Sequence, residues 1–419
     1  MAQTIASMSS VIHDMWTSKR IQKQFYNKNP LLAIILDAAG TKVDGMGLQA
    51  QVPIHSQRAA GYTSVAAAGG TLNPATNQGT AQATYTMVYH WFQVAMETAV
   101  LNQTDGSTRA IIAGKDLEMK GAIDDVSKQV SRQVARNGDS ILAECATGGA
   151  ATEVELLPAA SGGHGYDAIV RGHIYVGMPV DIGTTADTDS LVTGSVITAI
   201  EESPTSPSIT IGSSISTTAG THFVYWANPN SATAASPEIN GLENIVGTAT
   251  FGGLNPATAG NEYWKAYVDT TTTSFSLDFA LNLQLRVFQK DGTYDSKIAT
   301  NAKQMANFYS LLQNQVRFSG DMKLGAGGVG GLVGLDWNGI GVNVIPDIYD
   351  ADWFHFQPED LVMVRGSIKE PTWVSDLEGA GGDLRWVQGA TSFANAVVWP
   401  FNLGAQRRNR MAAGKSLTA

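Results

Sequence analysis

Residues 121–149, GAIDDVSKQVSRQVARNGDSILAECATGG, carry the most regular hydrophobic pattern of the chain. Apolar residues recur there at three-, four- and seven-residue steps, which is typical of one helix face: Ile123, Val126, Val130, Val134, Ile141 and Leu142. Polar residues fill the opposite face, and Gly148-Gly149 is a typical helix end. The pattern predicts a helix over about 115–147, about 50 Å long at 1.5 Å per residue. Such a length is unusual for an enzyme helix.

The segment before this helix has a different composition. Arg58–Ala83 is rich in small residues, contains Gly69-Gly70 and Asn73-Pro74, and has almost no large apolar side chain. Leu48–Ile54 and Ala83–Phe92 flank it and have β-strand character. We therefore predict a long two-stranded hairpin with a flexible tip. Because such a hairpin is only marginally stable alone, it needs another surface to lie on.

The first residues of the chain have the pattern of an arm. Val11–Tyr26 is a short amphipathic stretch, and Asn29-Pro30 follows it. The residue before a proline disfavours helix, so we expect a break there. Leu31–Leu36 then forms a small apolar anchor.

Residues 166–236 resemble a small β domain, a compact barrel or sandwich, because short apolar runs alternate with Gly, Ser, Thr, Asp and Pro. The runs are Ile169–Val170, His173–Val176, Pro179–Ile182, Ser195–Ile200, Ser208–Ile211 and His222–Trp226. Acidic residues concentrate in the same region: residues 150–260 contain ten, against one basic residue, Arg171.

The remaining chain mixes helix and strand. Two apolar stripes within 275–318 predict helices, and a glycine-rich loop follows at 325–334. Three apolar runs predict late strands: Gly339–Ile345, Asp360–Val364 and Ala394–Pro400. The order of elements indicates an α+β protein.

The composition excludes several classes of protein. Only 15% of the 419 residues are charged and the net charge is −10, whereas a typical soluble domain has about 25% charged residues. A normal 43% of hydrophobic residues argues against disorder, so we infer that much surface is hidden against partners. No apolar run is long enough for a membrane span, Met1–Ser10 does not resemble a secretory signal, and Cys145 is the single cysteine.

Motifs that would carry chemistry are absent or out of context. Gly325–Gly330 matches G-x-G-x-x-G, but a poor helix follows it, so we interpret it as a flexible loop. The seven histidines lack metal-ligand spacing, and there is neither a nucleophile elbow nor a phosphate-binding loop. Cys145 is expected to be a buried packing thiol. We predict no catalytic, cofactor or metal residues and no enzymatic activity.

Basic residues gather at both ends of the chain. The C-terminal group, Arg407, Arg408 and Arg410, could contact DNA phosphates non-specifically. It could equally pair with acidic residues of a neighbouring subunit. Both interpretations are kept.

Three segments resemble the major capsid proteins of tailed bacteriophages with the Hong Kong 97-type fold. Asp139–Cys145 looks like the end of that family's spine helix. Asn240–Ile245 with Asn255–Trp264 looks like its approach to the central domain. Trp337–Pro346 with Phe356–Leu361 looks like a late strand-turn-strand of that domain. The order of parts agrees along nearly the whole chain apart from the β-rich region.

The resemblance implies a domain plan, with an inserted small β domain as the departure from it. Its parts are an N-terminal arm at 1–54, an extended loop at 55–90, a peripheral domain with the spine helix at 91–165, the inserted domain at 166–236, a return to the peripheral domain at 237–265, an axial domain at 266–390, and a C-terminal strand with a basic tail at 391–419. The acidity of the insert suits a face turned away from DNA.

The implied function is self-assembly into pentamers and hexamers of an icosahedral head shell around double-stranded DNA. The virion would assemble in the host bacterial cytoplasm, without membrane or cofactor. Candidate inter-subunit contacts are Lys19, Arg20, Phe25, Arg58, Tyr62, Asn73 and Tyr85. Expected partners are further copies of the chain, a separate scaffolding protein, a portal protein, a decoration protein and packaged DNA. Some relatives cross-link through a lysine in the extended loop, but Arg58–Tyr89 contains none.

Three alternatives remain at this point. An encapsulin-like bacterial compartment resembles the same fold but would enclose a cargo enzyme. A phage tail tube or sheath subunit would form a helical tube and would not need a spine helix with a core-free hairpin. An enzyme is disfavoured because no candidate site converges in the sequence.

Overall fold

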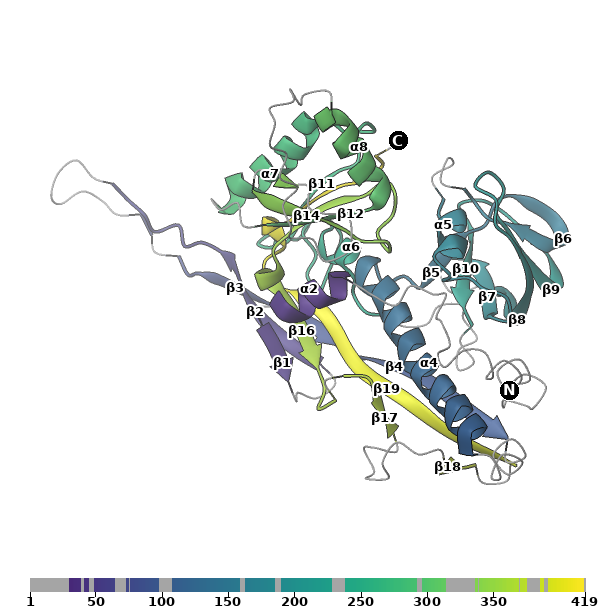
Figure 1. The fold of residues 1–419 in the computed structure, drawn as a ribbon. Helices are drawn as coiled ribbons and strands as arrows, with labels where there is room; N and C mark the ends of the chain where they lie inside the picture. The colour runs from purple at the N-terminus through teal and green to yellow at the C-terminus, as the bar shows by residue number, and fades with distance from the viewer. Residues whose placement is uncertain are drawn as a thin grey trace, which may run out of the picture.

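A computed structural model describes most of the chain. The described residues are 30–38, 41–44, 49–64, 73–74, 76–97, 108–158, 163–184, 190–227, 238–291, 296–313, 336–337, 339–368, 370–374, 385–387 and 391–417. Figure 1 shows an elongated body, a hairpin that projects from one flank, a β-sheet module on the opposite flank, and a helix-covered sheet above them. The glycine-rich loop at 325–334 lies outside the described residues.

The body combines one long helix with one sheet. Helix α4 spans Thr108–Ala135 and runs along strands β4, Val88–Glu97, and β19, Ser392–Ala405 (Figure 1). The body sheet has the order β1-β16-β19-β17, and β4 and β18 also pair with β19. The other bounds are Thr41–Asp44 for β1, Leu361–Arg365 for β16, Thr372–Trp373 for β17 and Arg385–Trp386 for β18. Because side chains alternate along a strand, Met96 on β4 is buried while Trp91 is 61% exposed.

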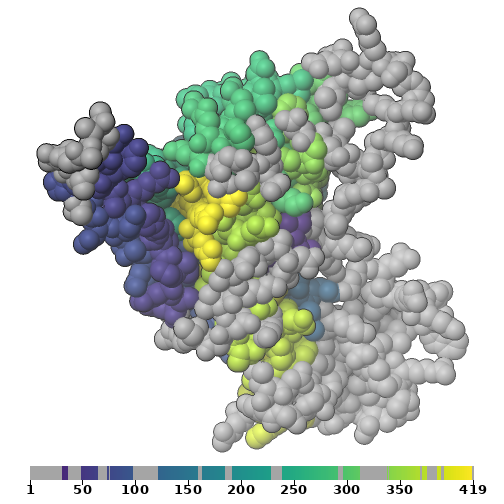
Figure 2. Space-filling view, turned by 90° about the vertical axis from the view of Figure 1, so that its left-hand side faces the viewer, coloured from purple at the N-terminus to yellow at the C-terminus, as the bar shows by residue number. Residues whose placement is uncertain are grey.

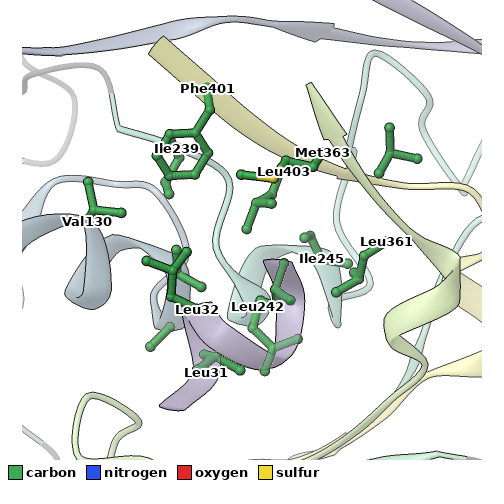
Figure 3. Packing of buried hydrophobic residues seen from close by; sticks show 14 of the residues in the cluster. Leu31, Leu32, Val130, Ile239, Leu242, Ile245, Leu361, Met363, Phe401 and Leu403 are labelled. Carbon is green, nitrogen blue, oxygen red and sulfur yellow. The ribbon is translucent and has the colours of Figure 1, made fainter. Parts of the chain in front are cut away.

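The core of the body collects apolar side chains from distant parts of the chain. Figure 3 shows α2, Pro30–Ala38, and α6, Leu242–Ile245, packed with α4, β16 and β19. Leu31 and Ile35 on α2 are fully buried, which confirms the apolar anchor that the sequence predicts. The long final strand is also confirmed, because β19 contains the predicted run Ala394–Pro400.

The long helix ends earlier than its periodicity predicts. After Ala135 the chain turns at Gly138, which has a φ of +80°. A Cβ there would lie 2.8 Å from the carbonyl oxygen of Ile239, so glycine fits this close approach. Ile141–Glu144 is strand β5 and Gly148–Glu155 is strand β6. Asp139–Cys145 is therefore not the end of a spine helix, and Gly148-Gly149 is not a helix end. The Asn-Gly-Asp turn overrides an apolar spacing that continues through Ile141 and Leu142.

The strands β5-β10-β7-β8-β9-β6 form what we call the lateral sheet. The remaining bounds are Pro179–Thr184 for β7, Ser190–Glu201 for β8, Ser208–Thr217 for β9 and His222–Trp226 for β10. The sheet thus begins at residue 141, before the predicted boundary at 166. Ile169–Val170 belongs to helix α5, Gly165–Val170, and His173–Val176 forms turns, so neither predicted strand exists there. A two- to four-residue apolar run does not distinguish strand from helix.

The strands β11-β20-β15-β12-β14-β13 form a third sheet, which we call the axial sheet. Its strands are Tyr267–Asp269 for β11, Lys297–Thr300 for β12, Asp336–Trp337 for β13, Ile340–Val344 for β14, Trp353–Phe356 for β15 and Ala412–Gly414 for β20. Helices α7, Leu277–Asp291, and α8, Ala302–Gln313, lie beside it and confirm the two predicted stripes (Figure 1). The predicted boundaries put residues 361–365 in the axial domain and residues 412–414 in the C-terminal tail. In the structure, the first segment is β16 of the body sheet and the second is β20 of the axial sheet.

Candidate assembly interface

The predicted hairpin projects from the body but is shorter at its second strand than expected. Strand β2, Gln49–Gln57, pairs antiparallel with β3, Gly79–Thr86. The predicted segment Ala83–Phe92 is divided at Met87, because β4 pairs with β19 instead. Figure 1 shows the far part of the hairpin extending away from the rest of the molecule. The residues at its base, among them Val52 and Ala83, are buried in the body.

Tyr85 anchors the hairpin to its own subunit. Its hydroxyl donates to the carbonyl oxygen of Ala405 at 2.7 Å and accepts from the amide of the same residue at 3.1 Å. A Cβ on Gly404 would lie 2.5 Å from the tyrosine ring, so this glycine makes room for it. Burial raises the pKa of Tyr85 to about 12. The side chain is 1% exposed, so the prediction that Tyr85 contacts a neighbour is wrong.

The distal contact candidates lie together on the hairpin. The Asn73 side-chain amide donates to the Tyr62 carbonyl oxygen at 2.9 Å, and the Asn73 backbone amide donates to Thr63 Oγ1 at 2.7 Å. Tyr62 is 84% exposed. Arg58 is also exposed and lies nearer the body, just after β2. Lys19, Arg20 and Phe25 fall outside the described residues.

Arg408 belongs to the core and not to a basic tail. Its guanidinium donates to the backbone carbonyl oxygens of five residues: Asn244 at 3.0 Å, Ile245 at 2.8 Å, Gly247 at 2.8 Å, Ala249 at 2.9 Å and Trp264 at 3.2 Å. Burial lowers the pKa of Arg408 to about 10, which leaves it charged at neutral pH. Its exposure is 0%, so it reaches neither DNA nor a neighbouring subunit. The apolar tail that follows, Met411–Ala413, is buried as well.

The two neighbouring arginines differ from Arg408. Arg410 forms an ion pair with Asp360 at 3.1 Å, while the Arg407 side chain is 60% exposed and lies 4.0 Å from Asp360. Both line a groove of about 590 Å³ at the base of the hairpin. Figure 2 views the molecule from this flank, with the C-terminal residues in yellow beside the hairpin in purple.

A polar junction joins the lateral sheet to helix α4 of the body and to the connection between β14 and β15. Asp347 accepts a hydrogen bond from Ser131 of α4 at 2.6 Å and lies 3.0 Å from Nε2 of His173. Burial alone would raise the pKa of Asp347, but the bonds from His173 and Ser131 and the charge of Arg136 hold it at about 2. Burial also lowers the pKa of His173 to about 4.

Two arginines extend the same junction. Arg171 binds the carbonyl oxygen of Ile348 and the carboxylate of Asp350, each at 3.2 Å. Arg136 lies 3.2 Å above the ring of Tyr349, and His164 stacks on that ring. Sequence reasoning missed this junction. Its one available signal was Arg171 as the lone basic residue in an acidic region, since a buried charge needs a partner.

Metal-ligand clusters and Cys145 are the other features of the described residues to which chemistry could be assigned. Among the described residues, no group of three His, Cys, Asp or Glu side chains is placed to bind a metal ion. Cys145 is buried in the lateral sheet, and burial raises its pKa to about 12, which suits a packing thiol. None of the helices in the described part of the chain combines the length and apolar character of a membrane span.

Comparison with known proteins gives a likeness in structure and none in sequence. No protein-family model matches the chain, and no curated protein is significantly similar to it. The chain is similar to one from the cyanophage A-1(L) capsid asymmetric unit, with a TM-score of 0.52, 12% identity and 96% of each chain covered. A native GTA particle capsid chain, at 9% identity and 96% coverage of each chain, has a TM-score of 0.45. The SrpI encapsulin of Synechococcus elongatus, at 6% identity and coverage of 100% and 96%, has a TM-score of 0.42. The likeness to the cyanophage chain has a TM-score above 0.5 and extends over 96% of each chain. The chain therefore has the Hong Kong 97-type capsid fold that its sequence predicts.

Proposed function

We propose that this chain is a major capsid protein of a tailed bacteriophage. Copies would form pentamers and hexamers and close into an icosahedral shell around double-stranded DNA. The observation that carries the proposal is the likeness to the cyanophage capsid chain over 96% of both chains. A hairpin that projects beyond its own subunit supports it, because such a segment completes its packing on a neighbour.

The geometry suits assembly by many modest contacts. One end of the hairpin is fixed in the body by Tyr85, and the other presents Tyr62 and Asn73 to the outside. Simultaneous contacts of this kind give high avidity without a large individual affinity. In a closed ring, every copy uses the same pair of surfaces, the distal hairpin and the surface that receives it.

The finer expectations belong to the same proposal. We assign the protein to the virion, with assembly in the host cytoplasm, and we expect a portal protein, a separate scaffolding protein and a decoration protein as partners. Packaged DNA would contact the shell non-specifically. We assign no enzymatic activity, because the Asp347 carboxylate of the junction is already bonded to Ser131 and to Nε2 of His173.

Electron microscopy of the purified protein tests the proposal. Co-expression with a scaffolding protein from the same genome should yield closed shells with pentameric and hexameric capsomers. Helical tubes would favour a tail protein. Shells that contain an enzyme and no DNA in infected or producing cells would favour an encapsulin-like compartment, and monomers under all conditions would contradict both.

A further inference from the structure

The groove at the base of the hairpin has a basic rim. It is lined by residues of β2, by the 254–264 loop and by the turn at 406–410. Arg58, Arg407, Arg408 and Arg410 contribute to this lining, and no Asp or Glu of the described residues does. Arg408 is bound to backbone carbonyl oxygens. Arg410 is engaged by Asp360, which leaves Arg58 and Arg407 as the exposed cations. The groove therefore favours an occupant that carries carboxylates.

The groove also offers apolar and hydrogen-bonding contacts. Tyr263 in its lining is 63% exposed, and Asn261 and Asn409 line it as well. An exposed tyrosine bordered by arginines is a composition typical of protein interfaces. The groove has a volume of about 590 Å³, which is enough for a few side chains of another protein segment.

The acidic surface of the chain lies on the opposite flank. Four exposed glutamates lie on strands β6 and β8, which flank β9, and on the turn after β8: Glu153, Glu155, Glu201 and Glu202. The register places Glu155 of β6 and Glu201 of β8 on either side of Ser208 of β9. The one basic residue of the lateral sheet region, Arg171, is paired with Asp350 at the junction and does not offset this charge.

The positions of the two surfaces suit a ring. Figure 1 shows the hairpin and the lateral sheet on opposite flanks of the body. Rotation about a ring axis brings one flank of each copy against the other flank of the next, which is a heterologous contact. Within such a ring, the flank of one copy that carries the basic groove would meet the flank of the next copy that carries the lateral sheet.

We propose that the groove at the base of the hairpin binds the acidic end of the lateral sheet of the adjacent copy, around Glu201 and Glu202. The inference rests on the proposed function, because it requires rings of this chain. It assigns the lateral sheet a role in contacts within a capsomer. Arg58 and Arg407 are the groove residues that bind the carboxylates.

Charge exchange tests this contact. One variant carries Arg58→Glu and Arg407→Glu, a second carries Glu201→Lys and Glu202→Lys, and a third carries all four changes. All four residues are exposed, so the subunits should fold, and thermal melting verifies this. Because like charges across an interface cost several kcal/mol, each of the first two variants should give at least about tenfold fewer shells. The third should restore the yield to within about threefold of the unchanged protein.

A matched control keeps the charge. Arg58→Lys with Arg407→Lys should assemble normally. The proposal is overturned if the fourfold variant assembles no better than the first two. It is also overturned if the arginine reversal leaves shell yield unchanged and lowers only DNA retention, since the groove would then bind phosphate. Failure of the unchanged protein to form shells would instead contradict the proposed function.

Cross-linking supplies a second measurement. Cys145 is buried, so cysteines placed by Arg407→Cys and Glu202→Cys would be the reactive ones. A flexible bis-maleimide should link successive copies into a ladder of up to five or six subunits. A product limited to dimers would mean a two-fold contact, and monomers alone would mean no contact; either result overturns the proposal.

Discussion

Arg408 shows how a charged residue can serve the core. Its five hydrogen bonds hold together the segment from Asn244 to Trp264, which approaches from a different part of the chain. The guanidinium donates to carbonyl oxygens of this segment, of which that of Gly247 also accepts from the Ala266 amide, and Phe251 packs against it at 4.8 Å. Arg408 therefore links the C-terminal turn to the α6 region through hydrogen bonds.

Replacement of Arg408 should be severe. Arg408→Leu leaves several buried carbonyl oxygens without donors, and we expect the free energy of unfolding to fall by at least about 3 kcal/mol. Denaturant unfolding of the unassembled subunit measures this loss. The adjacent exposed residue gives the control, since Arg407→Leu should change stability by no more than about 0.5 kcal/mol. Equal stability of the two variants would contradict the role assigned to Arg408.

The sequence could not distinguish these two arginines. Arg407, Arg408 and Arg410 share the same basic segment, and composition alone suggested one surface. Their environments differ because the turn η3, Arg408–Arg410, directs the first of its residues inward. Burial of a charge depends on carbonyl groups more than 140 residues away, which a local pattern does not reveal.

At the scale of elements, the base of the hairpin packs in its own subunit, whereas we expect its distal part to pack on neighbouring copies. Ala50, Val52, Ala83 and Tyr85 are buried in the body, whereas Arg58 and Tyr62 are exposed. A deletion beyond the base therefore removes little of the subunit's own core. Any loss that it causes should appear in assembly and not in folding.

Shortening the hairpin tests this division. Deletion within Gly61–Gly79, with a short turn joining the strands, should leave the melting temperature of the subunit within a few degrees. The same deletion should abolish shells in electron micrographs, because the contacts with neighbouring copies are lost. Normal shells from the shortened protein would contradict the role of the hairpin, and loss of the folded subunit would show that the distal part belongs to the core.

The elements that were predicted correctly have long and regular patterns. The stripes of α7 and α8 and the apolar run of β19 each extend over many residues, so one face is clearly defined. The errors fall on short runs. Ile141 and Leu142 continue the helix spacing but form β5, because the Asn137–Asp139 turn intervenes. Hydrogen bonds from the turn decide such cases and leave no trace in hydrophobic periodicity.

At the scale of the whole molecule, four histidines link stability to pH: His173 and His355 are buried, and His90 and His164 are half-buried. Burial lowers the pKa of His90 and His173 to about 4, of His355 to about 3 and of His164 to about 2. An unfolded histidine has a pKa of about 6.5. Between pH 6.5 and about 4 these histidines are protonated in the unfolded chain and neutral in the folded chain, so they lower stability as the pH falls. Asp352 opposes them, because burial raises its pKa to about 7. Each histidine contributes up to about 1.4 kcal/mol per pH unit in this window.

Thermal melting of the unassembled subunit at pH 7, 6 and 5 measures this dependence. We expect the melting temperature to drop steadily over that range. His90→Phe should reduce the slope, because it removes one of the histidines whose pKa burial lowers, beside Phe401. A melting temperature that is constant from pH 7 to pH 5 would contradict the prediction.

The composition of the whole chain is explained in part by the fold. The low charge content predicted hidden surface, and the small-residue hairpin outside the body agrees with that expectation. The concentration of acids in the middle of the chain corresponds to the lateral sheet, whose one arginine turns toward the axial domain. The sequence could reveal the sorting of charge along the chain. It could not reveal that basic and acidic groups occupy opposite flanks, because that depends on how the sheets are placed.

The position of β20 has a consequence for the order of synthesis. This strand lies between β11 and β15 in the axial sheet, although it follows them in the chain. Strand β11 joins that sheet through β20, so it has no partner there until residue 414 has left the ribosome. Chains released before that point lack a closed axial sheet. A chain that ends before β20 therefore lacks the strand that joins β11 to β15, so the axial sheet can be completed only after the last strand has been synthesised.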